Sequence, residues 1–448
     1  MCGIAGIIKK DKQQQVLPEE LEKMTAQMFH RGPDGSGIKI FGNTGIAHRR
    51  LSIIDIQGGH QPLSNEDQSI WTIFNGEIYN FCEIRRSLEV KGHAFKTKSD
   101  TEVLVHLYEE FGENLVSHLN GMFAFAIYDV KKRKLIFARD RLGQKPLFYF
   151  SDSAKFAFAS NIGALKTLSG FPEDIDLLSL DEYFSYQYVP SPKTIYKNVF
   201  KLPPAHLLVF NESNMTTFIT RYWKCAYDKK SDKSFPSACE ELRDLLSDAV
   251  RMRLVSDVPL GAFLSGGFDS TLVVGLMSKF SNSAVKTFTI GFDDEKYDER
   301  KFAKFASEHF NTEHYEKVVN PANINVLEKL VRHCGEPYSD SSILPTYMLS
   351  EFTRKNVTVA LSGDGSDEIF AGYYRYLVMK FAKIADFLPL KLRKNIAQKI
   401  IQFIPIGSAE RTFFSKARRV LKAVSESDEE RYLGIINRFD QKTKKAFY

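Results

Sequence analysis

The hydrophobic pattern of this chain changes near residue 236, and this change limits the fold more than any other feature. Up to about Phe218 most apolar runs are short and separated by Gly, Asn and Asp turns, as in SIWTIFNGEIY (69–79). Runs of this kind are typical of antiparallel strands. After Pro236 strands alternate with helices, as in VPLGAFL followed by FDSTLVVGLMSKF. This alternation predicts a parallel sheet with crossover helices.

The length of the chain also favours two folding units. A chain of 448 residues exceeds what one hydrophobic core usually organises. The polar stretch CAYDKKSDKSFP (225–236) has no period and is interpreted as a linker, after which Ser237 and Glu240 form a capping box that opens a helix. We therefore predict a protein of mixed α+β and α/β class, with domains at residues 2–220 and 237–448 and a linker at 221–236.

Charge and cysteine content exclude several functional classes. Lys and Arg number 61 against 55 Asp and Glu, a net charge of +6, but the basic residues are scattered, whereas a nucleic-acid surface gathers them on one face. The five cysteines are odd in number and far apart, which indicates a reducing compartment and argues against a disulfide framework and a zinc site. No apolar stretch resembles a secretory signal or a membrane span. We expect a cytoplasmic protein with neither a nucleic-acid nor a membrane partner.

A cysteine stands directly after the initiator methionine, in MCGIAGII. If Met1 is removed, Cys2 carries both a thiol and the α-amino group of the chain. An α-amine has a pKa of about 7.7 to 8.0, so part of it is free base at neutral pH and can accept the thiol proton. Cys2 is therefore a candidate nucleophile that needs no histidine as its base.

Three further stretches offer groups for attack on an amide. Asn75 and Gly76 in NGE would supply an oxyanion hole, although Asn-Gly is also the commonest tight hairpin turn. Arg50 in RLSII would grip a substrate carboxylate; the alternative is an arginine on an edge strand. Asp100 in SDTE would pair with a substrate ammonium, or belong to a capping box that opens the next helix.

Together, the motifs MCGIAGI, HRGPD, RLSIID, FNGEIYN, SDTE, GMFAFAIYD and RDRLGQKPLFY occur in an order that closely resembles class II glutamine amidotransferase domains. The resemblance implies an N-terminal nucleophile fold, an α/β/β/α sandwich in which two antiparallel sheets lie between helical layers. It implies that Cys2 attacks the side-chain amide of glutamine, with Asn75 and Gly76 as the oxyanion hole. The remaining glutamine-site residues implied are Arg50, Leu51, Ser52, Ile53, Ile54, Glu77 and Asp100, of which Asp100 meets the α-amino group.

Two glycine-containing loops of the second half each follow a strand. SGGFDS (265–270) would bring its backbone close to an anion at a helix N-terminus. It lacks the lysine of a Walker A loop, and the alternative is a tight turn that binds nothing. LSGDGSDE (361–368) carries three carboxylates, which could meet a polyphosphate only through a divalent metal such as Mg²⁺. The alternative is a set of solvated acids at a helix N-terminus.

As a pair, SGGFDS and LSGDGSDEIFAGY resemble the ATP pyrophosphatase domain of asparagine synthetases. The resemblance implies a doubly wound parallel α/β domain with extra helices, ATP as substrate and Mg²⁺ as cofactor. Asp364, where many relatives carry glutamate, would help to form an acyl-adenylate or deprotonate ammonia. The implied ATP-binding residues are Phe263, Ser265, Gly266, Gly267, Asp269, Ser270, Ile290, Ser362 and Gly363, and the implied magnesium ligands are Asp269 and Asp367.

Fused in this order, the two domains resemble the asparagine synthetase B family over essentially the whole chain. The resemblance implies that ammonia from glutamine attacks an aspartyl-AMP made from ATP and aspartate, giving asparagine, AMP and pyrophosphate, with a homodimer as the assembly considered. Two alternatives stay open: the same chemistry on another carboxylate, in surface-glycan or secondary metabolism, and a glutaminase whose synthetase half is inactive. The chain stops at Tyr448 without the VPFLD-like segment of the family, so we expect the second domain to be incomplete at its C-terminus.

Overall fold

The computed structural model describes residues 1–296, 298–319, 326–404, 413–439 and 441–446. Contacts between residues divide the chain into two compact units, one formed by Met1–Ser179 with Val189–Ser362 and the other by Leu180–Tyr188 with Gly363–Tyr448. This division follows contacts and does not test the domain boundaries drawn from the sequence, which stay predictions.

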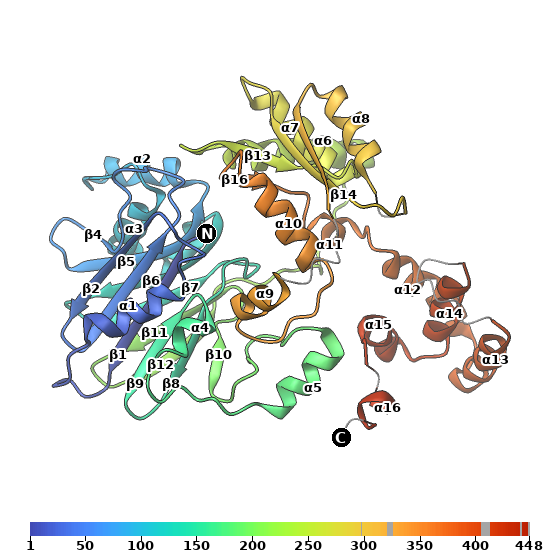
Figure 1. Ribbon diagram of the computed structural model, residues 1–448, viewed down its shortest axis with the longest axis horizontal. Helices are drawn as coiled ribbons and strands as arrows, with labels where there is room; N and C mark the ends of the chain where they lie inside the picture. Colours follow the sequence, from blue (N-terminus) through green and yellow to red (C-terminus); the bar gives the residue numbers. More distant parts are fainter. Residues whose placement is uncertain (297, 320–325, 405–412, 440, 447–448) are drawn as a thin grey trace. The chain divides into compact units, whose positions relative to one another are not determined.

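The first unit contains two six-stranded sheets whose paired strands are antiparallel (Figure 1). The first sheet has the order β10-β8-β9-β1-β3-β2 and the second the order β12-β11-β7-β6-β5-β4. Strands of the first sheet are β1 (Gly3–Lys9), β2 (Gly35–Phe41), β3 (Thr44–Arg50), β8 (Phe148–Ser151), β9 (Lys155–Ala159) and β10 (Val199–Lys201). Strands of the second are β4 (Leu63–Ser64), β5 (Ile70–Ile78), β6 (Gly121–Asp129), β7 (Lys134–Arg139), β11 (His206–Asn211) and β12 (Thr216–Arg221).

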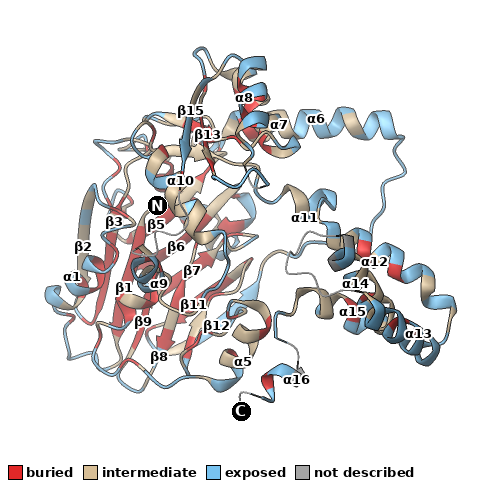
Figure 2. Ribbon diagram, turned by 45° about the vertical axis from the view of Figure 1, so that its right-hand side comes forward, coloured by how far each residue is buried: buried red, intermediate tan, exposed pale blue. Residues whose placement is uncertain are grey.

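Three apolar cores order these sheets into layers. The inner core joins Ile4 of β1 to Ile73 of β5, so the two sheets pack face to face. Each outer face forms a separate core with helices, and most strand residues are buried (red in Figure 2). The expected α/β/β/α sandwich is therefore confirmed. The covering helices are α1 (Pro18–Ala26) and α4 (Ile162–Leu165) on the first sheet, and α2 (Phe81–Val90), η1 (Asp100–Glu102), α3 (Val103–Phe111) and η2 (Gly112–His118) on the second.

Strand β1 fixes the start of the chain. It pairs with β3 on one side and β9 on the other. Its side chains alternate as strand geometry requires: Ile4 and Ile8 enter the inner core, whereas Ala5 and Ile7 enter the outer core. Cys2 directly precedes this central strand and is thereby held at a defined place.

The first unit also contains a parallel sheet with the order β15-β14-β13-β16. From β13 the chain adds β14 and then β15 on one side, and it returns to place β16 on the other side of β13. Because such crossovers are right-handed, helices lie on both faces, which is the doubly wound arrangement expected. The reversal lies between β13 and β16, where sheets of this kind bind ligands at the carboxyl ends of their strands. The elements are β13 (Leu260–Phe263), α7 (Phe268–Phe280), β14 (Lys286–Gly291), α8 (Arg300–His309), β15 (Glu313–Val318), α9 (Leu327–Cys334), α10 (Ile343–Thr353) and β16 (Val359–Leu361).

Helix α6 (Phe235–Met252) leads into this sheet and begins earlier than predicted. Its cap is Ser234, whose side chain accepts a hydrogen bond from the N–H of Ser237. The capping box assigned to Ser237 and Glu240 is therefore wrong. Pro236 lies in the first turn, where the missing N–H of a proline costs nothing.

The second unit is helical in its described residues. Arg431 is fully buried at its centre, 2.6 Å from Asp386, which also pairs with Arg393 at 2.7 Å. Nowhere in the described part of the chain does a helix combine the length and apolarity that a membrane span needs. The helices are α5 (Leu177–Tyr186, shared with the first unit), α11 (Ser366–Phe370), α12 (Tyr374–Ile384), η4 (Ala385–Phe387), α13 (Leu390–Phe403), α14 (Phe413–Val424), α15 (Asp428–Ile436) and α16 (Gln441–Lys444).

Candidate active site

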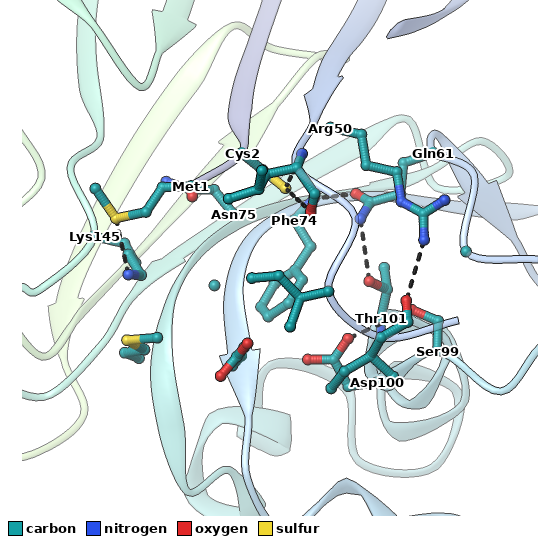
Figure 3. Close-up of a pocket in the computed structure, with 17 residues that line it drawn as sticks. Met1, Cys2, Arg50, Gln61, Phe74, Asn75, Ser99, Asp100, Thr101 and Lys145 are labelled. Carbon is teal, nitrogen blue, oxygen red and sulfur yellow. Dashed lines mark hydrogen bonds between the residues drawn. The ribbon is translucent and has the colours of Figure 1, made fainter. Parts of the chain in front are cut away.

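A pocket opens where the chain begins, beside the N-terminal end of β1 (Figure 3). It holds about 520 Å³ of empty space, part of it open to solvent. Every residue predicted for the glutamine site lines it except Ser52, whose N–H donates to Asp34 Oδ2 at 2.8 Å. The lining residues are Met1, Cys2, Arg50, Leu51, Ile53, Ile54, Gly59, Gln61, Phe74, Asn75, Gly76, Glu77, Ser99, Asp100, Thr101, Met122 and Lys145.

The Cys2 thiol lies against the backbone of Leu51. The N–H of Leu51 donates to Sγ at 3.4 Å, and Sγ lies 3.6 Å from the carbonyl oxygen of Leu51. Burial raises the pKa of the thiol, and the hydrogen bonding with the Leu51 backbone partly opposes that rise. A buried thiol of this kind needs an adjacent base to become a nucleophilic thiolate.

The terminal amine can serve as that base. Burial, followed by the charges of Arg31 and Lys145, lowers the pKa of the Met1 amine to about 5. If Met1 is removed, Cys2 becomes the first residue and carries the free α-amine. The carbonyl oxygen of Cys2 accepts a hydrogen bond from Arg31 Nε at 3.0 Å. We expect the same burial and the nearby charge of Arg31 to keep the Cys2 amine unprotonated at neutral pH, as a general base requires.

Asn75 and Gly76 lie inside strand β5 and not in a turn. They pair with Ala124 and Phe123 of β6, so the hairpin alternative is wrong. A Cβ on Gly76 would stand 2.1 Å from the carbonyl oxygen of Met122, so only glycine fits there. Asn75 is fully buried, yet neither atom of its side-chain amide finds a hydrogen-bond partner among the described residues. Because a buried unpaired amide is costly, this amide is suited to receive a substrate oxygen.

The outer edge of β5 offers a second donor for the same oxygen. In the described structure β4 covers only the start of β5 on that side. Further along, the N–H of Phe74 donates to Gln61 Oε1 at 2.7 Å and the N–H of Ile78 donates to Asp100 Oδ2 at 3.0 Å. Successive N–H groups alternate between the two edges of a strand. The N–H of Gly76 therefore points to this edge, between two groups that are already satisfied.

The guanidinium of Arg50 shapes the loop that borders the pocket. Nη1 donates to the carbonyl oxygen of Ile56 at 2.9 Å, and Nη2 donates to those of Ile54 at 3.1 Å and Asp55 at 2.6 Å. A bidentate grip on a substrate carboxylate would have to share or displace these bonds. The role of Arg50 toward a substrate carboxylate stays a prediction.

Two carboxylates face the pocket and are held close to protonation. Burial and the charge of Asp100 raise the pKa of Glu77 to about 7. Burial raises the pKa of Asp100 to about 6, although Ile78 N and Ser99 Oγ donate hydrogen bonds to it. Both ionised forms would gain from a nearby cation, and the α-ammonium group of an amino acid is such a cation.

We expect Glu77→Gln to stabilise the protein above pH 7. The folded pKa of Glu77 is raised above its unfolded value, so the wild type keeps its full stability below about pH 4 and loses stability as pH rises to about 7. Glutamine carries no charge, and the variant avoids that loss, on the order of 2 kcal/mol. Thermal unfolding at pH 4 and pH 8 checks this, with the exposed Glu83→Gln as control. An equal Tm difference at both pH values would contradict the assignment.

Three residues that support the site, Gln61, Lys145 and Arg31, were given no role from the sequence. Gln61 accepts from Phe74 N and donates from Nε2 to Thr101 Oγ1 at 3.1 Å, which ties β5 to the segment carrying Asp100. Lys145 Nζ lies 3.0 Å from Met1 Sδ, and Arg31 holds the Cys2 carbonyl. Arg31 and Lys145 stand in the motifs HRGPD and RDRLGQKPLFY, so the sequence held a signal for them. Gln61 stands in no motif that was recognised.

The loop that delivers Lys145 is organised by one buried carboxylate. Asp140 Oδ1 accepts from the N–H groups of Leu142 and Gln144, and Oδ2 accepts from those of Phe123 and Lys145, at 2.9 to 3.1 Å. A carboxylate with this many N–H donors fixes a loop firmly. This explains why the aspartate stands inside the RDRLGQKPLFY motif.

A short segment connects the pocket loop to the parallel sheet within the first unit. The N–H of Asp257 donates to the carbonyl oxygen of Ile53 at 3.0 Å, and Asp257 Oδ2 accepts from the N–H of Asp55 at 2.7 Å. Strand β13 begins three residues later and ends at the SGGFDS loop. The pocket loop and the SGGFDS loop thus lie at the two ends of residues 257–265.

The SGGFDS loop joins β13 to α7 in a tight turn. Gly266 has a φ of +76°, and a Cβ there would stand 2.3 Å from the backbone of Phe302, so glycine is needed on both counts. Ser265 Oγ lies 3.0 Å from Ser270 Oγ and accepts from the N–H of Gly267 at 3.3 Å. In the described structure α7 starts without a side-chain cap, so the N–H groups of its first turn are available to an anion.

Other residues predicted for ATP lie at the same edge of this sheet. Phe263 ends β13, Ile290 lies in the neighbouring strand β14, and Ser362 directly follows β16 on the other side of β13. The first unit therefore brings the SGGFDS loop, Phe263, Ile290 and Ser362 to the carboxyl ends of adjacent parallel strands. This edge includes the reversal of strand order between β13 and β16.

The acidic loop continues into the second unit, which contains Gly363, Asp364 and Asp367. Asp364 is exposed and Asp367 is half-buried, while Glu368 accepts a hydrogen bond from Tyr373 Oη at 2.6 Å. Carboxylate oxygens are the donors that Mg²⁺ prefers. Asp269, half-buried in the first turn of α7, offers such an oxygen in the first unit, and Asp367 offers one in the second. Their role as magnesium ligands stays a prediction.

Comparison with known proteins agrees with this geometry. Residues 1–223 match a family described as a glutamine amidotransferase domain, and residues 241–445 match one described as asparagine synthase. Asparagine synthetase (glutamine-hydrolyzing) 1 of Bacillus subtilis strain 168 is 37% identical over 448 residues, which cover 99% of this chain and 69% of that protein. Putative asparagine synthetase (glutamine-hydrolyzing) 2 of Methanocaldococcus jannaschii is 40% identical over 405 residues, covering 84% and 76% respectively. The chain therefore belongs to the family of glutamine-hydrolysing asparagine synthetases, which are ATP-dependent carbon–nitrogen ligases.

Proposed function

We propose that this chain transfers the amide nitrogen of glutamine to aspartate and makes asparagine at the expense of ATP. The observation that carries the proposal is the buried, unpartnered amide of Asn75 beside Cys2 in one pocket. An unpaired donor next to a nucleophile is what attack on an amide requires. Family membership supports ATP as the second substrate and aspartate as the acceptor.

In the glutaminase reaction Cys2 Sγ gives its proton to the terminal amine and attacks the side-chain carbon of glutamine. The carbonyl electron pair moves to the oxygen, where Asn75 Nδ2 and the N–H of Gly76 stabilise the negative charge. Collapse of this intermediate expels ammonia, which takes the proton from the amine. Water then hydrolyses the thioester to glutamate and regenerates Cys2. Glu77 and Asp100 hold the α-ammonium group through these steps.

In the synthetase reaction the side-chain carboxylate of aspartate attacks the α-phosphorus of ATP and pyrophosphate leaves. The N–H groups of the SGGFDS loop and of the first turn of α7 hold the phosphates, with Ser362 and Gly363 near the α-phosphate. Ammonia then displaces AMP from the acyl-adenylate, with Asp364 as the group that accepts a proton. Asp269 and Asp367 are the carboxylates that we propose as ligands for Mg²⁺, which would neutralise phosphate charge.

Product analysis tests the proposal. The purified protein is given glutamine, ATP and Mg²⁺ with either aspartate or a panel of other carboxylates, and glutamate, pyrophosphate and asparagine are measured. We expect pyrophosphate and asparagine to appear in equal amounts with aspartate. If pyrophosphate is released with another carboxylate and not with aspartate, that carboxylate is the acceptor. If glutamate forms without any ATP cleavage, the protein is a glutaminase and not a synthetase.

Asp257→Ala is expected to impair the use of glutamine more than the use of free ammonia. The substitution removes the acceptor for the N–H of Asp55 and frees the loop that borders the glutamine pocket. We expect KM for glutamine to rise roughly three- to tenfold, with ammonia-dependent synthesis changed less. Asp257→Asn keeps an acceptor oxygen and should stay close to wild type. Equal losses with both nitrogen donors would show that the contact between Asp257 and Asp55 stabilises the first unit in general and does not act on the pocket loop alone.

A further inference from the structure

A cluster of histidine and glutamate side chains lies outside the lining of the pocket, on α3 and on the segments that follow β4 and α2. These three elements are labelled in Figure 1. Three members, His93, which follows α2, and His106 and Glu109 on α3, have ligand atoms within 4.8 Å of one another. The fourth, Glu66, follows β4 and lies 4.0 Å from His106 Nδ1 through its Oε2. His106 and Glu109 are three residues apart and so share one face of the helix. We call these four residues the His–Glu cluster.

The distances within the His–Glu cluster match those of a metal site. His106 Nδ1 lies 2.8 Å from Glu109 Oε2 and 4.0 Å from Glu66 Oε2, and His93 Nδ1 lies 3.4 Å from Glu109 Oε2. In a tetrahedral zinc site with bonds of about 2.0 to 2.1 Å, neighbouring ligand atoms are about 3.3 Å apart. These three separations scatter around that value. Glu66 lies outside the group of three whose atoms are all within 4.8 Å of one another, so its side chain would shift toward His93 and Glu109 to complete the coordination.

The second oxygen or nitrogen of three members is held by another group. Glu109 Oε1 accepts from Asn65 Nδ2 at 2.7 Å, and Glu66 Oε1 accepts from the N–H of Ala94 at 3.1 Å. His93 Nε2 lies 3.1 Å from Glu110 Oε1. Each of these partners leaves the other atom of the carboxylate or imidazole turned toward the cluster. Partners of this kind orient ligands in metal sites, and the pairing of His93 with Glu110 is the carboxylate–histidine arrangement typical of zinc.

Charge also favours a cation in the His–Glu cluster. The side chain of His106 is 1% exposed, and its Nε2 finds no hydrogen-bond partner among the described residues. The Nδ1 atom of the same ring faces Glu109 Oε2 at 2.8 Å and is the atom that a cation would bind. Two carboxylates with a neutral imidazole leave a negative charge that one divalent ion would balance. Glu66 and Glu109 keep 40% and 25% of their side chains exposed, which leaves a path for an ion to enter.

We propose that Glu66, His93, His106 and Glu109 bind one Zn²⁺ ion that ties three segments of the first unit together. Imidazole and carboxylate ligands suit Zn²⁺, and four protein ligands leave no open position, which marks a structural site. The cysteine spacing does not bear on this site, because no cysteine takes part in it. The segment between His93 and α3 carries Ser99 and Asp100 into the pocket, so the ion would stabilise the segment that presents Asp100.

The experiment uses the full chain, stripped of metal with a chelator and then titrated with Zn²⁺ or Co²⁺. We expect one equivalent to bind, the visible absorption of tetrahedral Co²⁺ to appear, and Tm to rise on addition of Zn²⁺, because an ion that binds only the folded state stabilises it. Glu66→Gln and His93→Gln should weaken binding at least about tenfold. Both side chains are partly exposed, so these variants are expected to fold.

Glu113→Gln is the matched control, because Glu113 is an exposed glutamate near the end of α3 that pairs with Lys134. It should bind Zn²⁺ like the wild type. The competing explanation is direct contact of His93 with Glu109 and Glu110 without any metal. Absence of the Co²⁺ absorption with an unchanged Tm would establish that explanation and overturn the proposal. Equal binding by wild type, Glu66→Gln and His93→Gln would place the ion elsewhere and overturn it as well.

Discussion

Replacing Cys2 by alanine is expected to reduce glutamine hydrolysis by about 10³-fold or more, because in the proposed function the thiol beside Asn75 attacks the amide. Pyrophosphate release with free ammonia should persist, since the SGGFDS loop follows a strand of a different sheet. Glutamate is measured by a coupled dehydrogenase assay and pyrophosphate in parallel. A variant that forms glutamate at the wild-type rate would exclude Cys2 as the nucleophile.

Mass spectrometry of the N-terminus completes this experiment. Met1 lines the pocket, and a chain that keeps Met1 has no free amine on Cys2. We expect the active protein to begin at Cys2 and a glutamine-analogue alkylator to add one label there. Cys82→Ala, which changes an exposed cysteine outside the pocket, should keep both label and rate. Full activity in a chain that retains Met1 would rule out the terminal amine as the base.

The second large effect is expected for Asn75→Ala, which should lower kcat for glutamine hydrolysis by about 10² to 10³. The substitution removes one of the two donors for the developing oxyanion. Stability should change by less than about 1 kcal/mol, because the Asn75 amide makes no hydrogen bond to the described residues that could be lost. Steady-state kinetics and thermal unfolding of the same preparation measure both quantities.

Asn80→Ala provides the opposite pattern as a control. Asn80 Nδ2 donates to the carbonyl oxygen of His118 at 2.9 Å, and Oδ1 accepts from the N–H of Asn120 at 3.0 Å. Losing these bonds should cost about 1 kcal/mol of stability and leave kcat near the wild-type value. If Asn75→Ala instead lost stability and kept kcat, Asn75 would be a structural residue.

The sequence motifs predicted the sandwich, the parallel sheet and most of the pocket, because those features are local. Cys2, the run from Arg50 to Ile54 and the stretch Asn75–Glu77 each lie within one short segment. Their placement follows from the order of the motifs. Ser52 does not line the pocket, since its N–H donates to Asp34, which precedes β2, and that contact has no local signal; its role toward glutamine stays a prediction.

Groups that come together only through the fold could not be predicted. The bond between Gln61 and Phe74 spans 13 residues, and Asp55 with Asp257 spans 202. The His–Glu cluster likewise draws on three separate segments. The Asn-Gly pair was ambiguous because the tight-turn preference of these residues is a local rule. The pairing that overrides it joins Asn75 to Ala124 and Gly76 to Phe123, which are distant in the sequence.

The uncovered edge of β5 has a consequence for what the pocket can accept. A bare strand edge normally invites another polypeptide to extend the sheet. Here Gln61 and Asp100 already occupy the positions on either side of Gly76, so there is room for one carbonyl and not for a whole strand. A single amide group would dock as the smallest possible addition to the sheet, and longer peptides would be turned away by the two flanking side chains.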